Sequence, residues 1–245
     1  MKPNTANKSF MKKRDWKKYL FEFSSIFIAV ISAFALSNWN DSQNSQHSEQ
    51  KILIEILNSL EIDLRDFNIN INGNELSLKA DQIFQNLLKE PIVNNEKISE
   101  ENIAIQYIRL FRDYIPIVNK SAYESLKANN LKTVQNDLLR IQIIELYDYY
   151  YSIIEKLEYE VPEMKSYQNY FQKTNSLLFP FMEFNSNGDL INFDELHNLT
   201  ELNKKEILSY LWRIRENRKL KLTRYEMIIA KMKELELSIK NELNQ

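Results

Sequence analysis

The sequence contains no cysteine and almost no glycine. Without thiols, disulfide frameworks, thiolate metal sites and cysteine nucleophiles are excluded. Gly73 and Gly188 are the only glycines, and only five prolines accompany them. Sandwiches, barrels and glycine-rich phosphate-binding loops need many tight turns. The scarcity of glycine and proline therefore favours long helices.

Histidine-dependent catalysis or metal binding has few candidate residues, because His47 and His197 are the only histidines. His47 lies in a polar stretch with no second ligand at a suitable spacing, and His197 follows only Asp194 and Glu195. Both are predicted to be surface residues. No Ser/His/Asp order, phosphate-binding loop or paired-carboxylate motif stands out. The sequence predicts no catalytic residue, no cofactor and no metal site.

The segment from 179 to 200 is the main irregular stretch of the chain. Within it, Asn185, Asn187 and Asp189 have the first spacings of a calcium-binding loop, but Leu196 stands where the loop needs a bidentate carboxylate. A polar turn is predicted instead. Residues 179–193 also contain several aromatic side chains, which are interpreted as a cap on the helical bundle, with a partner-binding patch as the alternative.

Positive charge is concentrated at the N-terminus. Residues 1–18 contain seven basic residues and a single acidic one, Asp15. Residues 41–245 hold 25 of the 32 basic and 32 of the 34 acidic residues, which gives a net charge of −7. An acidic body without a basic stripe offers no electrostatic surface for nucleic acid, so no nucleic-acid partner is expected.

The most apolar stretch is 23–39, with the sequence FSSIFIAVISAFALSNW. At a rise of about 1.5 Å per residue this helix would be about 26 Å long, and about 31 Å if it begins at Tyr19, which matches a bilayer core. Tyr19 and Trp39 stand where an aromatic belt would place them. By the positive-inside rule, residues 1–18 are predicted to be a basic cytoplasmic stub, 19–40 a transmembrane anchor in the inner membrane, and 41–245 an extracytoplasmic domain.

Two other interpretations of this stretch are weaker. Ala33-Phe34-Ala35 has the form of a signal-peptide cleavage site, but the acidic Glu22 and the long apolar region suit a signal peptide poorly. A buried core helix is the second alternative. It is disfavoured because no later segment is comparably apolar on all sides.

Small residues recur every four positions inside the anchor, at Ser25, Ala29, Ala33 and Ser37. Such spacing lets helix backbones approach closely in lipid, and Glu22 projects near the same face. The pattern therefore predicts self-association or docking on a partner helix, with Glu22 as a polar contact or proton site. The alternative is that serine and alanine are simply common in anchors and that Glu22 pairs with Lys18 one turn earlier.

Beyond the anchor, apolar residues repeat with a helical period, which predicts an all-α bundle of long helices. A first helix over 43–90 is expected to be kinked or interrupted at Asn72-Gly73 and to end at Pro91. Further helices are expected over 99–114, 121–130 with a Ser121–Glu124 capping box, 136–161 capped by Asn136 or Asp137, 163–178 and 203–243. The tyrosines Tyr147, Tyr149, Tyr150 and Tyr151 predict a centrally buried helix, with an aromatic ligand cleft as the alternative.

Two segments carry a family resemblance. The anchor KYLFEFSSIFIAVISAFALSNWND and the segment SAYESLKANNLKTVQNDLLRIQIIELYDYY resemble an uncharacterised family of single-pass, N-terminally anchored helical membrane proteins of Bacteroidota. The resemblance implies that an Ala-Tyr-x-x-Leu-Lys stretch and an Asn-x-x-Leu-Arg helix are the structural motif. Its positions in this chain are Ala122, Tyr123, Leu126, Lys127, Asn136, Leu139 and Arg140. The turn between them reads Ala128-Asn129-Asn130, where relatives often have Ser-Ser-Gly. The resemblance implies no activity.

These observations predict a membrane-anchored, non-catalytic interaction or scaffold protein of the bacterial envelope. Its partners would be the lipid bilayer and either a second copy of the chain or another envelope protein. The alternative is a sensory or accessory subunit of a membrane complex that binds a ligand in its periplasmic bundle. An enzyme is disfavoured because no catalytic set is recognisable.

Overall fold

The computed structural model describes residues 13–89 and 102–244, with side chains from residue 16 onward. They divide into two compact units between Lys51 and Ile52, and the first helix contributes to both. The α-helices are α1 (Lys13–Lys89), α2 (Ile103–Phe111), α3 (Ser121–Asn129), α4 (Asp137–Ile144), α5 (Tyr151–Glu155), α6 (Gln172–Leu178) and α7 (Glu201–Leu243). The π-helical turns are η2 (Glu145–Tyr150), η3 (Lys156–Glu160) and η5 (Tyr167–Phe171). The 3-10 turns are η1 (Leu131–Thr133), η4 (Pro162–Met164), η6 (Phe179–Phe181) and η7 (Leu196–Asn198). The strands are β1 (Met182–Phe184) and β2 (Leu190–Phe193).

In the first unit, α1 presents an apolar surface that the unit does not cover. Every side chain from 16 to 48 is exposed except Ser24, which is half-buried. The most apolar window of 18 residues has a mean hydropathy of 2.0 and none of it is buried. By length and composition this helix can cross a membrane. Because the stretch is exposed throughout, its interpretation as a buried core helix is wrong.

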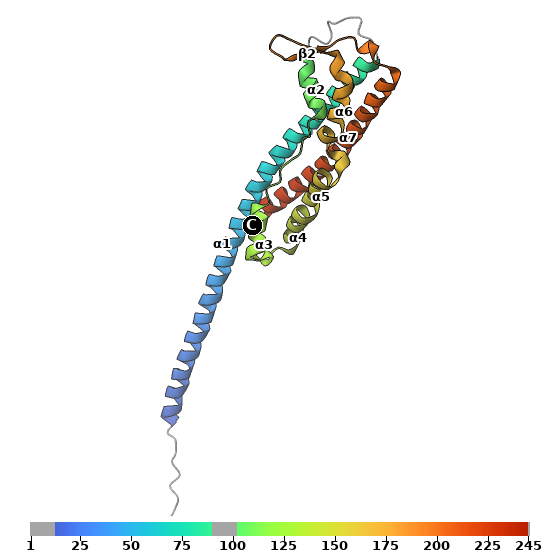
Figure 1. The fold of residues 1–245 in the computed structure, drawn as a ribbon. Coiled ribbons are helices and arrows are strands. Elements are labelled where there is room, and N and C mark those ends of the chain that lie inside the picture. Colours follow the sequence, from blue (N-terminus) through green and yellow to red (C-terminus); the bar gives the residue numbers. More distant parts are fainter. Residues whose placement is uncertain (1–12, 90–101, 245) are drawn as a thin grey trace, which may run out of the picture. The chain divides into compact units, whose positions relative to one another are not determined.

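In the second unit, α1 and α7 pack side by side in opposite directions (Figure 1). The ring of Phe67 on α1 meets that of Tyr225 on α7 with their centroids 5.7 Å apart. Further along α1, Asp81 contacts Arg215, which lies ten residues earlier on α7. The two long helices thus form the spine against which the shorter elements pack.

The core of this unit consists of two hydrophobic clusters. The first joins the part of α1 between 52 and 67 to α3, to α4 and α5, and to residues 225–239 of α7. The second joins the part of α1 between 80 and 88 to α2, β2 and residues 207–214 of α7. Between the clusters, both long helices bury polar side chains instead: Asn70, Asn74 and Ser77 on α1, and Asn217, Arg218 and Lys221 on α7. We call this region the polar layer.

The connection from α2 to α3, residues 112–120, forms neither helix nor strand. Its backbone is held by side chains of α1: Ile117 N–H donates to Asp66 Oδ2 at 2.7 Å, and Asn119 N–H donates to Asp63 Oδ1 at 2.8 Å. Backbone donors that lie against a core must find acceptors, and here carboxylates supply them. We call this connection the strap.

The expected interruption of α1 at Asn72-Gly73 is wrong, because the helix continues to Lys89. Gly73 is instead a point of close approach: a Cβ built on it would overlap the ring of Tyr114 from the strap. Glycine here removes a side chain that would collide, and it does not turn the chain. Pro91, the expected end of this helix, lies outside the described residues.

The expected boundaries of the next helices need two corrections. The helix expected over 99–114 is described from Ile103 and ends at Phe111, because Arg112 leaves the helical region for an extended conformation. The capping box of Ser121 and Glu124 is also wrong. The N-cap is Lys120, whose side chain makes no capping hydrogen bond. Before it, Asn119 Oδ1 accepts from both the N–H and the hydroxyl of Ser121, at 3.1 and 2.6 Å.

The helix expected over 136–161 is confirmed at its start. Asn136 Oδ1 accepts from the N–H groups of Leu138 and Leu139, at 3.1 and 3.2 Å, as an N-cap does. The sequence did not indicate that π-helical turns η2 and η3 would interrupt the α-helical winding. Central burial is confirmed for Tyr147 and Tyr151, whereas Tyr149 is exposed.

The helix expected over 203–243 is confirmed as α7, whereas the one expected over 163–178 is only partly confirmed, because the 3-10 turn η4 and the π-helical turn η5 precede α6. The segment between these two helices is not purely irregular. Residues 182–193 form an antiparallel hairpin, a small departure from the all-α prediction. Asn185 Oδ1 accepts from the N–H groups of Asn187 and Asp189, and Gly188 has a φ of +83° that suits glycine, so the polar turn is confirmed. Phe193 is buried in the second cluster, as a cap requires, while Phe184 stays exposed.

Candidate functional site

The polar layer is built around a buried ion pair. Glu158, carried by the π-helical turn η3, accepts from Lys221 Nζ at 2.7 Å and from the Tyr225 hydroxyl at 2.6 Å. Glu158 and Lys221 are 2% and 1% exposed. Burial raises the pKa of Tyr225, so its hydroxyl stays protonated and serves as a donor to the carboxylate.

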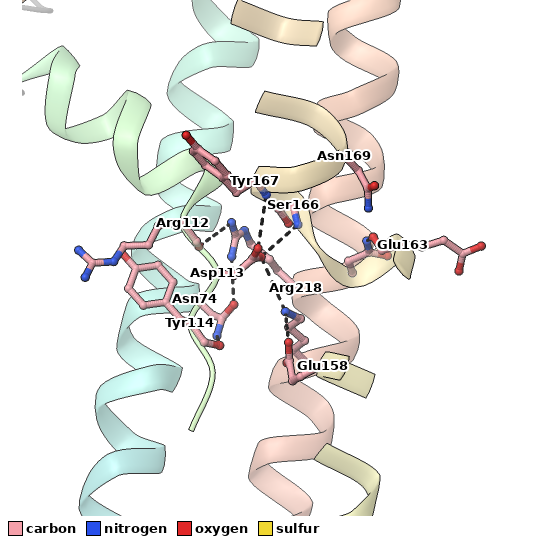
Figure 2. Close-up of polar contacts among 12 residues, drawn as sticks. Asn74, Arg112, Asp113, Tyr114, Glu158, Glu163, Ser166, Tyr167, Asn169 and Arg218 are labelled. Carbon is pink, nitrogen blue, oxygen red and sulfur yellow. Dashed lines mark hydrogen bonds and ion pairs between the residues drawn. The ribbon is translucent and has the colours of Figure 1, made fainter. Parts of the chain in front are cut away.

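Arg218 occupies the centre of the layer (Figure 2). One guanidinium nitrogen donates to Asn74 Oδ1 at 3.2 Å, and the other donates to the carbonyls of Leu110 and Arg112 at 2.9 and 3.1 Å. Burial lowers the pKa of Arg218, while nearby carboxylates, Asp113 foremost, act in the opposite direction. This side chain therefore ties α7 to α1, to the end of α2 and to the start of the strap.

Asp113 connects the polar layer to the turn η5. Its two carboxylate oxygens accept from the N–H groups of Ser166 and Tyr167, at 3.1 and 3.4 Å, and Lys221 Nζ lies 3.9 Å away (Figure 2). The layer thus contains two cations, Arg218 and Lys221, and two carboxylates, Asp113 and Glu158. Their charges balance, and each carboxylate is already occupied by donors.

A groove opens beside Asp113, between α2 and η5. It has a volume of about 470 Å³, within the range of small-molecule sites. Its lining consists of Tyr107, Ile108, Phe111, Arg112, Asp113, Tyr167 and Phe171. We call it the aromatic groove.

The rings of this groove hold one another in place. Phe111 meets Phe171 edge to face with centroids 5.4 Å apart, and Tyr167 stacks on Phe171 at 4.7 Å. Tyr107 meets Phe111 edge to face at 5.3 Å and donates its hydroxyl to Asn175 Oδ1 at 3.0 Å. Offset and edge-to-face pairs of this kind are the favourable aromatic arrangements. The groove is therefore preformed by the packing of the protein.

Among the described residues that line the groove, Arg112 is the one cation. Figure 2 shows its side chain pointing away from Arg218 and Glu158, on the opposite side of the strap from Asp113. Its guanidinium lies 5.7 Å from the centre of the Tyr114 ring. Within the described part of the chain, no carboxylate lies within ion-pair distance of Arg112.

A second buried carboxyl, Asp63, lies in the first hydrophobic cluster and is fully buried. Besides the N–H of Asn119, it accepts from the Tyr151 hydroxyl at 2.6 Å. Burial raises its pKa to about 6, an effect that the hydrogen bonds from Tyr151 and Asn119 only partly offset. Asp63 is thus a buried carboxyl whose pKa lies well above that of an ordinary aspartate.

The residues of the proposed family motif meet at the corner between α3 and α4. Tyr123 donates to Asp148 Oδ2 at 2.7 Å and stacks on Tyr147 with centroids 4.6 Å apart, while Lys127 lies over the Tyr123 ring. Leu126 and Leu139 are buried in the first cluster.

Two further motif residues secure the ends of this corner. Asn136, besides capping α4, donates to Glu242 Oε2 at 2.6 Å, which fixes α4 to the end of α7. Arg140 donates to the carbonyl of Val134 at 2.8 Å and pairs with Asp137. The contacts of the motif are packing and capping contacts, and none of its residues lines the aromatic groove.

The residues of the proposed membrane-packing face lie on α1 in the first unit. Glu22 approaches Lys18 Nζ at 3.9 Å, the pairing expected one turn apart. The Ser25 hydroxyl donates to the carbonyl of Phe21 at 2.8 Å. The side chains at Ala29, Ala33 and Ser37 are exposed. Whether this face packs against another helix stays a prediction.

Sequence reasoning missed the groove, although a signal was present. Both of its walls have the spacing Tyr-x-x-x-Phe, at Tyr107–Phe111 and at Tyr167–Phe171, which places two rings on one helix face. The polar layer carried no such signal, because its asparagine, arginine and lysine residues look like ordinary surface residues of a charged helix.

The described residues also bear on the other candidate chemistries. His47 and His197 are exposed, as predicted. No group of three or more histidine, aspartate or glutamate residues in the described part of the chain is arranged to hold a metal ion. No protein-family model, curated protein or solved structure matches the chain.

Proposed function

We propose that this protein is a membrane-anchored, non-catalytic interaction or scaffold protein of the bacterial envelope. The exposed apolar surface of α1 in the first unit carries this proposal. Large side chains such as Phe21, Phe23 and Phe34 are 67–75% exposed there, which is untenable in water and favourable in lipid. The anchor would be retained in the inner membrane, with the basic residues 1–18 in the cytoplasm and the helical domain outside.

The helical domain has the properties of a rigid binding body. Arg218 and the Glu158–Lys221 pair join α7 to α1, the strap and η3, which supports a domain that holds its shape without a ligand. The anchored interaction protein would associate with a second copy or with another envelope protein. Membership in the Bacteroidota family that the anchor and the α3–α4 corner resemble is part of this proposal.

The aromatic groove favours a second candidate function, that of a sensory or accessory subunit binding a ligand. A preformed apolar groove with one uncompensated cation is a common form of small-molecule site. Both candidates require the same anchor and the same orientation.

Orientation is testable because the chain has no cysteine. Two matched variants, Ser9→Cys in the stub and Ser186→Cys in the exposed hairpin turn, each introduce one thiol. In spheroplasts, a membrane-impermeant maleimide should label Ser186→Cys at once and Ser9→Cys only after lysis. The reverse pattern would invert the orientation. Release of the wild-type chain into the soluble fraction at alkaline pH would overturn the anchor.

The interaction function is tested by gentle purification of the tagged full-length protein from its native membranes, followed by native mass spectrometry. A stoichiometric second protein or a defined homo-oligomer is expected. A monomer without any partner, at every detergent concentration tried, would contradict the interaction function and leave ligand binding as the remaining candidate.

A further inference from the structure

We propose that the aromatic groove binds a small organic carboxylate with an aromatic body. This inference rests on the second proposed function, ligand binding by the helical domain, and adds the chemical class of the ligand. It stands on the shape of the groove, the nature of its walls and the charge at its polar end.

The walls select an aromatic body. Ile108 and Tyr167 are 61% and 59% exposed at the rim, whereas Tyr107 and Phe111 are buried in the floor. The stacked pair of Tyr167 and Phe171 shows the spacing that a further ring would adopt against the same wall. Flat rings fit such a surface better than flexible chains, because they lose less conformational entropy on binding.

The polar end selects a negative charge. Asp113 accepts from the N–H groups of Ser166 and Tyr167, and Lys221 Nζ lies 3.9 Å away, so its negative charge is offset within the protein. Asp113 and Arg112 are the two charged residues among the described residues of the lining, and no described carboxylate pairs with the Arg112 guanidinium. Its guanidinium has the planar donor geometry that matches a carboxylate.

The size of the groove limits the ligand to a small molecule. A volume of about 470 Å³ accepts a two-ring compound with a carboxylate and excludes a folded protein element. Arg112 is exposed, and only its backbone carbonyl contributes to the polar layer. Its side chain can thus be changed without disturbing that network.

The test uses the full-length protein in lipid nanodiscs and isothermal titration calorimetry, with empty nanodiscs as the control for partition into lipid. Three probes share one aromatic body: 2-naphthoate is anionic, 2-naphthalenemethanol is neutral and 2-naphthylmethylammonium is cationic. Decanoate keeps the carboxylate and replaces the rings by a chain. We expect 2-naphthoate to bind one to one and each of the other three to bind about tenfold more weakly or worse.

Two variants locate the binding. Arg112→Gln should weaken the binding of 2-naphthoate by about tenfold or more. Arg109→Gln, the matched change three residues earlier on α2 and outside the groove lining, should change it by no more than about twofold. Equal effects of the two variants, equal binding of all three naphthalene probes, or no binding of 2-naphthoate at millimolar concentration would each overturn the inference. Tight binding of decanoate with weak binding of 2-naphthoate would overturn the aromatic specificity.

Failure of this test and failure of the proposed interaction function are distinguishable. A partner found in native membranes together with no probe binding would retain the interaction function and remove the ligand site. Probe binding by a protein that purifies as a monomer would retain the ligand site and remove the interaction function.

Discussion

Gly73 lies directly beneath the ring of Tyr114. A Cβ at position 73 would meet three atoms of that ring well inside 3.0 Å, a distance that real Cβ atoms essentially never show. The Tyr114 carbonyl accepts from Asn74 Nδ2 at 3.3 Å, so the strap is fixed to α1 at the next residue as well. The strap reaches α1 at the one helical position without a side chain.

Gly73→Ala should therefore destabilise the protein, although alanine is the better helix former by about 1 kcal/mol. Overpacking of this kind costs about 1–3 kcal/mol. Urea unfolding of the full chain in nanodiscs would measure the change. In a Tyr114→Ala background the effect of Gly73→Ala on stability should change sign, and the substitution should stabilise the protein by about 1 kcal/mol. Destabilisation in both backgrounds would contradict the proposed collision.

This glycine also shows how far sequence can lead. Asn-Gly is a strong turn signal in isolation, and on that basis an interruption of the helix was expected at Asn72-Gly73. The signal is local, whereas the ring that needs the space comes from Tyr114, 41 residues later. The same dipeptide at Asn187-Gly188 does form a turn, because short strands flank it and no long helix passes through it.

The periodicity of apolar residues predicted the helices, and the clustered tyrosines predicted a centrally buried helix. Asn136 could be predicted as a cap because capping depends only on neighbouring residues. The polar layer did not follow. Arg218 and Lys221 have the spacing and charge of a solvated helix face, and only the packing of η3 and the strap over them makes them buried. Periodicity identifies which side of a helix is apolar, and it says little about polar residues that find partners far away in sequence.

Loss of Lys221 should be among the most damaging single changes in the domain. Lys221→Met leaves the Glu158 carboxylate buried without its cation, and breaking a buried pair in this way costs about 3–5 kcal/mol. The double variant Lys221→Met with Glu158→Gln removes the stranded charge and should recover part of that loss. Urea unfolding of the single and double variants gives the comparison.

A surface pair supplies the control for this experiment. Lys240 Nζ lies 2.6 Å from Glu236 Oε1, about as close as Lys221 Nζ lies to Glu158 Oε2, but both side chains contact solvent. Lys240→Met should cost no more than about 1 kcal/mol. If Lys221→Met were equally mild, the polar layer would be far more hydrated than its burial indicates.

Asp63 should make the stability depend on pH. Its pKa is raised from 3.8 to about 6 in the folded protein, mainly by burial. Below about pH 4 the carboxyl is protonated in both states and imposes no penalty. Between pH 4 and 6 the unfolded chain releases the proton while the folded one retains it, so stability falls as pH rises, by about 3 kcal/mol in all, and then levels off.

The contribution of Asp63 is isolated by difference. Asp63→Asn keeps an acceptor for Asn119 N–H and removes the titrating group. The decrease in the free energy of unfolding between pH 4 and 6, measured by urea unfolding, should therefore be smaller in this variant than in the wild type. Tyr151→Phe removes a hydrogen bond that favours the carboxylate, and it should move the fall to higher pH. Identical pH profiles for all three proteins would show that Asp63 does not titrate in this range.

The small-residue face of α1 makes a prediction about assembly in the membrane. Replacing Ser25, Ala29 and Ala33 together by leucine keeps the segment apolar but prevents two helix backbones from approaching closely. If this face forms the contact, the dissociation constant of an oligomer should rise by about tenfold or more, because packing in lipid has no hydrophobic drive to replace it. The matched control changes Phe27, Ile28 and Ile31, which point elsewhere around the helix, to leucine. Fluorescence energy transfer between labelled chains in liposomes measures both variants. An oligomer equally stable in both would leave the pairing of Glu22 with Lys18 as the role of that glutamate, and would place any assembly in the helical domain.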